Sequence, residues 1–153
     1  MGSDFISKRN NTSYLSFVNQ YLEIKKTYRN IESDTIHRNC FEIVMNIMPS
    51  DNSSTYKVKL ICKQGRSPIV ILLSPLLEQK DGKYPHHIYK LYKSGQAKLC
   101  VYYPGNNEWD NSMSIATTFI PWISTWLNAY EYWLITGEWH YDEKFIGNDK
   151  KEG

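Results

Sequence analysis

The sequence predicts an α+β domain built from an N-terminal helix, an antiparallel meander of strands, a long loop that carries a cysteine, and a second helix. Two stretches place apolar residues three or four positions apart, which is the spacing of a helix with one buried face. Three shorter apolar stretches lie between them and are joined by short connections. Helices and strands do not alternate along the chain, so a parallel sheet is not expected.

The first helix is predicted over Thr12–Ile31, where Asn11 and Thr12 are suitable capping residues. The apolar positions that form its buried face are Tyr14, Leu15, Val18, Tyr21, Leu22, Tyr28 and Ile31. The polar segment Glu32–Asn39 predicts an irregular connection to the first strand.

Three strands are predicted, over Phe41–Met48, Thr55–Lys63 and Pro68–Leu73. The second strand shows the clearest alternation of apolar residues with lysines, which only Ile61 interrupts. Its apolar positions are Tyr56, Val58, Leu60 and Cys62. Such alternation is typical of a half-buried antiparallel strand.

The segment Ser74–Ala97 shows no clear period and predicts a long irregular connection, which in a compact domain is usually functional. The second helix is predicted over Ile115–Thr136, with Pro121 in its first turn or at a kink and Gly137 as its terminator. One domain is expected over residues 10–140, followed by a flexible tail over residues 141–153.

Composition excludes several classes of function. The net charge is +2 and the basic residues are scattered, so no nucleic-acid partner is expected. No apolar run approaches the roughly 18 residues that cross a bilayer, so no membrane partner is expected either. The start of the chain lacks the apolar core of a signal peptide, and the three cysteines have neither disulfide nor zinc-site spacing. We therefore expect a cytoplasmic protein without a bound metal or cofactor.

The three cysteines differ in their surroundings. Cys62 lies on the apolar face of its predicted strand, which indicates a buried structural thiol. Cys40 sits at the edge of the first strand without a visible partner. Cys100 follows the long loop and is flanked by residues capable of chemistry, although the pattern alone is equally compatible with a buried thiol.

The region around Cys100 resembles a known family. It contains His87-Ile88-Tyr89, Gly95, Leu99-Cys100-Val101, Trp109 and the second helix in the order and spacing of the active-site region of ubiquitin-conjugating enzymes. The closer resemblance is to the stand-alone prokaryotic branch found in CBASS antiphage systems. It is carried by Leu99-Cys100-Val101-Tyr102-Tyr103-Pro104, by Trp122, Trp126 and Trp133, and by Gly137-Glu138-Trp139.

The resemblance implies a ubiquitin-conjugating-like fold in which Cys100 is the catalytic nucleophile. The chain departs from the family in three respects. Pro85, His86 and His87 replace its His-Pro-Asn triplet, the loop between His87 and Cys100 is a few residues longer than in the eukaryotic pattern, and no room remains for a C-terminal helix pair. The role of the missing asparagine can pass to His86 or His87, or to Asn106 or Asn107. The remaining candidates for positioning the substrate are Tyr89, Tyr102 and Trp109, although Trp109 is better explained as a packing anchor.

The function that the resemblance implies is acyl transfer. Cys100 would hold a protein C-terminus as a thioester and pass it to an amine, thereby priming antiphage signalling. The implied partner is a cGAS/DncV-like nucleotidyltransferase, and no cofactor is required; whether an activating enzyme is a second partner stays open. Two alternatives stay open: an inactive binding module with the same fold, and a cysteine hydrolase that uses His86 or His87 as its base.

Overall fold

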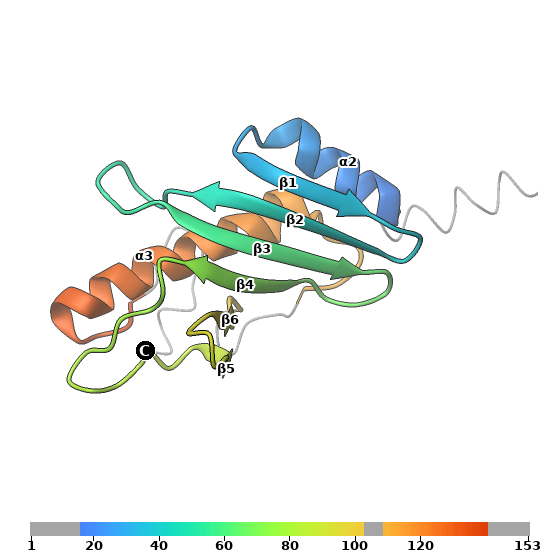
Figure 1. Ribbon diagram of the computed structural model, residues 1–153. Coiled ribbons are helices and arrows are strands. Elements are labelled where there is room, and N and C mark those ends of the chain that lie inside the picture. Colours follow the sequence, from blue (N-terminus) through green and yellow to red (C-terminus); the bar gives the residue numbers. More distant parts are fainter. Residues whose placement is uncertain (1–15, 103–108, 141–153) are drawn as a thin grey trace, which may run out of the picture.

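The structure, a computed structural model, describes residues 16–102 and 109–140 and has the predicted α+β fold. Six strands form one antiparallel sheet in the order β1-β2-β3-β4-β6-β5, and Figure 1 shows α3 running behind it. The elements are α2 (Phe17–Thr27), β1 (Ile31–Ile36), β2 (Cys40–Ile47), β3 (Tyr56–Lys63), β4 (Ile69–Ser74), β5 (Ile88–Leu91), β6 (Ala97–Leu99), η1 (Ile115–Phe119) and α3 (Ile120–Thr136).

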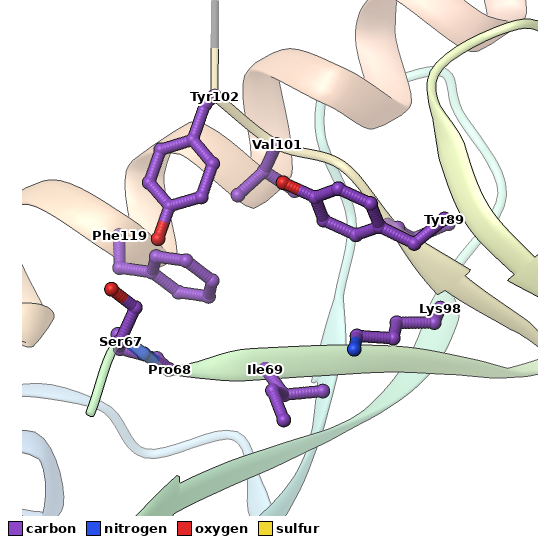
Figure 2. Close-up of a pocket in the computed structure, with 9 residues that line it drawn as sticks. Ser67, Pro68, Ile69, Tyr89, Lys98, Val101, Tyr102 and Phe119 are labelled. Atoms are coloured by element: carbon purple, nitrogen blue, oxygen red, sulfur yellow. The ribbon is translucent and has the colours of Figure 1, made fainter. Parts of the chain in front are cut away.

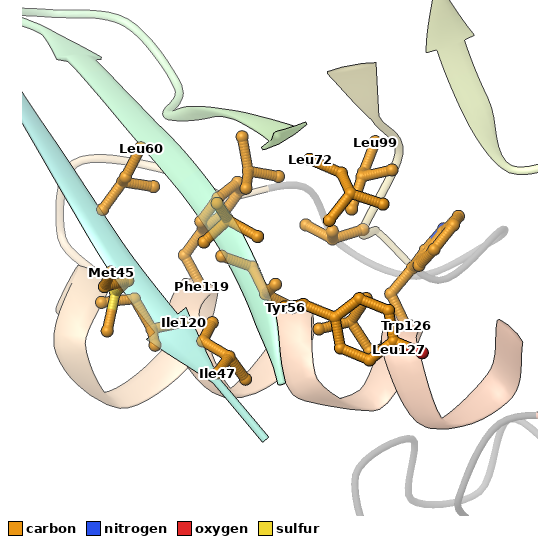
Figure 3. Packing of buried hydrophobic residues seen from close by; sticks show 14 of the residues in the cluster. Met45, Ile47, Tyr56, Leu60, Leu72, Leu99, Phe119, Ile120, Trp126 and Leu127 are labelled. Carbon is orange, nitrogen blue, oxygen red and sulfur yellow. The ribbon is translucent and has the colours of Figure 1, made fainter. Parts of the chain in front are cut away.

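The strands β2 and β3 supply the centre of the core. They pair over eight positions, and every second residue of both strands is buried. The buried pairs are Phe41–Cys62, Ile43–Leu60, Met45–Val58 and Ile47–Tyr56. Figure 3 shows these strands packing on Phe119, Ile120, Trp126 and Leu127 from η1 and α3. The alternation predicted for the second strand, with Ile61 on the outer face, is confirmed.

The N-terminal helix ends earlier than predicted, and its predicted start, with Asn11 and Thr12 as caps, lies outside the described residues. The hydroxyl of Ser16 caps α2 by accepting from the Asn19 N–H, and the helix ends at Thr27 rather than Ile31. The segment Glu32–Asn39, predicted to be an irregular connection, instead contains β1. That prediction was wrong because β1 is an edge strand: it pairs only with β2 and is largely exposed, so it has no apolar alternation.

The segment Ser74–Ala97 is also more regular than predicted, because it includes β5 and leads directly into β6. These short strands form a hairpin whose turn contains Gly95 at φ +94°, where a side chain would be strained. The hairpin joins the sheet through just two β4–β6 pairs, Ile71–Lys98 and Leu72–Ala97. The sheet therefore has six strands rather than the three predicted, and the additional strands lie at its edges or next to one.

The second helix is confirmed, with a modified start. The residues of η1 form one π-helical turn, after which Pro121 occupies the first turn of α3, a position that suits the fixed φ of proline. Gly137 ends the helix in the left-handed conformation, at φ +84°. No helix of residues 16–102 and 109–140 is long and apolar enough to cross a membrane. The predicted domain limits stay predictions, and the predicted tail lies outside the described residues.

Candidate active site

Cys100 directly follows β6 and is tied to the segment that precedes β5. Its backbone N–H donates a hydrogen bond of 3.1 Å to the carbonyl oxygen of His87. The same oxygen accepts a second hydrogen bond, of 2.8 Å, from the indole N–H of Trp126 on α3. Since Trp126 is completely buried, this carbonyl links the cysteine segment to the rigid core. The structure therefore places the backbones of Cys100 and His87 in contact, and the catalytic roles of their side chains stay predictions.

The imidazole of His87 is half-buried and packs at 5.0 Å, between ring centroids, against Trp139, which follows α3. Burial, and secondarily the nearby His86, lowers the pKa of His87 below its ordinary value. The ring is therefore neutral at neutral pH, and a neutral imidazole has one nitrogen that donates and one that accepts a hydrogen bond. His86 is exposed to solvent.

The three thiols differ in accessibility. Cys62 is 3% exposed among apolar neighbours, and this burial raises its pKa well above the ordinary value, so it is a structural residue as predicted. Cys40 and Cys100 are both partly exposed. Cys40, however, lies on β2, which β3 and β4 separate from the β5–β6 hairpin. The backbone of Cys100, in contrast, is hydrogen-bonded to that of His87. Among the described residues, no three His, Cys, Asp or Glu side chains are grouped to hold a metal.

A cleft of about 270 Å³ opens where β4 and β6 cease to pair (Figure 2). It is lined by Leu99 and Val101, the two neighbours of Cys100 in the sequence, but not by Cys100 itself. On one side lie Ser67 and the start of β4; on the other lie the residues before and after the cysteine. The nine lining residues are Ser67, Pro68, Ile69, Tyr89, Lys98, Leu99, Val101, Tyr102 and Phe119. Figure 2 shows the Tyr89 and Lys98 side chains extending in the same direction above β4.

The remaining predicted site residues fall into three groups. Tyr89, which is 56% exposed, and the partly buried Tyr102 both line the cleft. Trp109 is only 6% exposed and belongs to the core, and its carbonyl accepts a hydrogen bond from the Ser67 hydroxyl. Its part in substrate positioning stays a prediction. Asn106 and Asn107 lie outside the described residues.

Several residues of the site were missed from the sequence. Trp126 was identified from the sequence only as part of the family resemblance. Its hydrogen bond to the His87 carbonyl has no sequence signal, because every residue has a backbone carbonyl. The contact of Trp139 with His87 depends on the chain turning back after α3. Lys98 had a usable signal: it lies two residues before Cys100, and residues two apart in a strand share a face.

An N-terminal helix, an antiparallel sheet and a second helix to which the cysteine segment is anchored define a ubiquitin-conjugating-like fold. The family model of the Type II CBASS E2 protein matches residues 20–146, most of the chain, and the protein belongs to this family. Membership gives it an E2-like role in CBASS antiphage systems, with a partner within such a system. No curated protein matches the chain.

Proposed function

We propose that Cys100 accepts the C-terminus of a partner protein as a thioester and transfers it to an amine. The observation that carries the proposal is a partly exposed cysteine whose backbone is hydrogen-bonded to that of His87, on a segment held to the core through Trp126. A reactive thiol needs access, and a reaction site needs a fixed geometry. Family membership supports E2-like chemistry at this place.

The partner proposed is the cGAS/DncV-like nucleotidyltransferase of the same CBASS system, which would present its C-terminal carbonyl in activated form. The Cys100 thiolate attacks that carbonyl carbon, a C–S bond forms, and the activating group leaves. An amine then attacks the thioester, a C–N bond forms, and the C–S bond breaks to regenerate the thiolate. The amine loses one proton in this second step.

His87 is the residue proposed to assist the second step. Because its imidazole is neutral at neutral pH, one nitrogen can accept the proton of the incoming amine. The N–H of the other nitrogen can instead donate a hydrogen bond to the oxyanion that develops on the carbonyl. These two roles differ in one respect: only the first is abolished at a pH where the imidazole is already protonated.

The test combines the protein with the nucleotidyltransferase and any activating enzyme encoded beside it, with ATP present, and measures intact mass. We expect a wild-type adduct that dithiothreitol removes. Cys100→Ser should give an adduct that resists dithiothreitol, because an oxygen ester is less reactive toward thiols. Cys40→Ser is the matched control, since it removes the other partly exposed thiol and should load like the wild type.

Three outcomes would contradict the proposal in different ways. Co-elution of the two proteins without any adduct would favour the inactive binding module. Release of a shortened or free C-terminus, without a lasting adduct, would favour the cysteine hydrolase. An adduct that persists after Cys100→Ala would place the chemistry at another residue.

A further inference from the structure

The cleft lined by the two neighbours of Cys100 has a marked chemical character. Of its nine lining residues, all within the described part of the chain, only Lys98 is charged at neutral pH and none is acidic. Tyr89 and Tyr102 contribute phenol groups to the lining, while Pro68, Ile69, Val101 and Phe119 supply apolar walls. A cation above an apolar base suits a carboxylate on a short hydrocarbon stem.

The positive charge at this edge is reinforced from β5. Lys90 pairs with Lys98 in the β5–β6 ladder, and like charges opposite one another are unfavourable unless something offsets them. The Lys98 ammonium lies 5.4 Å from the centre of the Tyr89 ring, and that of Lys90 lies 5.1 Å from the centre of the Tyr92 ring. Among the described residues, no carboxylate lies within 4.0 Å of either ammonium. An acidic ligand would supply the missing counter-charge.

The position of the cleft relative to the thiol limits which residue of a ligand can occupy it. Exposure alternates along this segment: Leu99 and Val101 are buried, whereas Lys98, Cys100 and Tyr102 are partly exposed. Lys98 and Cys100 are therefore expected to share a face, separated by two residues, or about 7 Å along an extended chain. A peptide attached to Cys100 through its terminal carbonyl covers the same length with two residues.

We propose that this cleft binds the acidic side chain of a residue located two or three positions before the C-terminal residue that Cys100 carries. The inference rests on the proposed function and adds a rule of substrate selection to it: the protein C-terminus accepted by this enzyme is acidic close to its end. The cleft volume, about 270 Å³, suits one or two side chains and is below the range of typical small-molecule sites.

The experiment uses synthetic peptide thioesters that end in glycine and carry Glu, Gln or Lys two or three residues before it. Cys100 attacks the thioester carbonyl, the peptide–Cys100 bond forms, and the small thiol leaves, so neither ATP nor an activating enzyme is required. We expect the Glu peptide to load about fivefold faster than the Gln peptide at low salt, as for a partly exposed charged contact. Added salt should reduce this preference.

Variants decide whether Lys98 is responsible. Lys98→Met should remove the preference for Glu over Gln, and Lys98→Glu should reverse it in favour of the Lys peptide. Lys93→Glu makes the same charge change in the turn of the same hairpin, away from the cleft, and should retain the Glu preference. Circular dichroism of each variant confirms that it is folded.

Failure of the inference and failure of the proposed function give different results. If the wild type loads all peptides at equal rates, and Cys100→Ala loads none, the thioester chemistry stands and the acidic-residue rule is overturned. If no peptide loads, the proposed function fails. Fluorescence anisotropy of the corresponding peptide amides with Cys100→Ser then decides the inference alone: tighter binding of the Glu peptide supports it, and equal binding overturns it.

Discussion

The β2–β3 pair and the β5–β6 hairpin are both antiparallel, yet they are built for different purposes. The first pairs over eight positions and buries one whole face, including Cys62. The second has strands of four and three residues and joins the sheet through two pairs, and it leads directly to Cys100. The β2–β3 pair stabilises the fold through its buried face, whereas the β5–β6 hairpin places a partly exposed thiol near the edge of the sheet.

The comparison also shows how a weakly attached hairpin keeps a defined position. The hydrogen bond from Trp126 to the His87 carbonyl connects the hairpin to α3, independently of the strand ladder. The packing of Trp139 against both Trp126 and His87 covers that connection. The site is therefore held from two directions, by the β4–β6 pairs and by the hydrogen bond from α3.

Thiol accessibility should give the largest difference between the two regions. In a protein that retains Cys100 alone (Cys40→Ser, Cys62→Ala), maleimide should react at least about a hundredfold faster than in one that retains Cys62 alone (Cys40→Ser, Cys100→Ser), because buried thiols are inert. Labelling followed by intact mass at pH 7 measures both rates. Comparable rates in the folded proteins would refute the assignment of Cys62 to structure and Cys100 to chemistry.

The second largest difference should be in stability, because a substitution in the β2–β3 pair should destabilise the protein more than one in the β5–β6 hairpin. Leu60→Ala removes a completely buried side chain of β3 and should lower the free energy of unfolding by about 3 kcal/mol. Leu91→Ala, at a 37% exposed position of β5, should lower it by less than about 1 kcal/mol. Urea denaturation followed by circular dichroism provides both values. A larger loss for Leu91 would mean that the hairpin belongs to the main core.

The connection through Trp126 should have a smaller effect. Trp126→Phe retains a buried ring but removes the N–H donor, so it should cost about 1 kcal/mol or somewhat more and slow peptide loading several-fold. Trp133→Phe, two turns further along the buried face of α3, is the matched control and should change loading little. Hydrogen exchange at the Cys100 amide should rise in the first variant only; unchanged exchange would show that the indole does not hold the hairpin.

The smallest expected effect concerns the pH dependence of stability. Burial lowers the pKa of His87 in the folded state, so the unfolded state binds the proton more readily. The resulting stabilisation is complete above the unfolded pKa of about 6.5 and is lost as the pH falls through the lower folded pKa. The wild type should therefore lose more stability between pH 7.5 and 5.5 than His87→Gln, as measured by urea midpoints. Identical pH profiles would contradict a depressed pKa.

The sequence predicted the secondary structure correctly where the burial of one face imposes a regular spacing of apolar residues. The alternation of Tyr56, Val58, Leu60 and Cys62 predicted β3 correctly, and the apolar spacing after Ile115 predicted α3. The strands β1, β5 and β6 were missed because edge position and short length remove that period. The residue order around Cys100 predicted the family, which the match over residues 20–146 confirms.

The site was predictable in part for a similar reason. Cys100, His87, Tyr89 and Tyr102 have side chains that suggest chemistry, so pattern and resemblance could select them. The cleft could not be predicted, because it arises where β4 and β6 separate after the Lys98–Ile71 pair. Such a separation depends on the twist and length of the strands, which no local motif encodes.

The central claim is that Cys100 carries the acyl group, and the most direct measurement is to map the bond itself. The adduct formed with the nucleotidyltransferase by the Cys100→Lys variant, which converts the thioester into a stable amide, is digested and sequenced by tandem mass spectrometry. The account predicts a single branched peptide that joins the partner's C-terminal residue to position 100. A branch at any other position, or a partner residue other than its C-terminus, would contradict it.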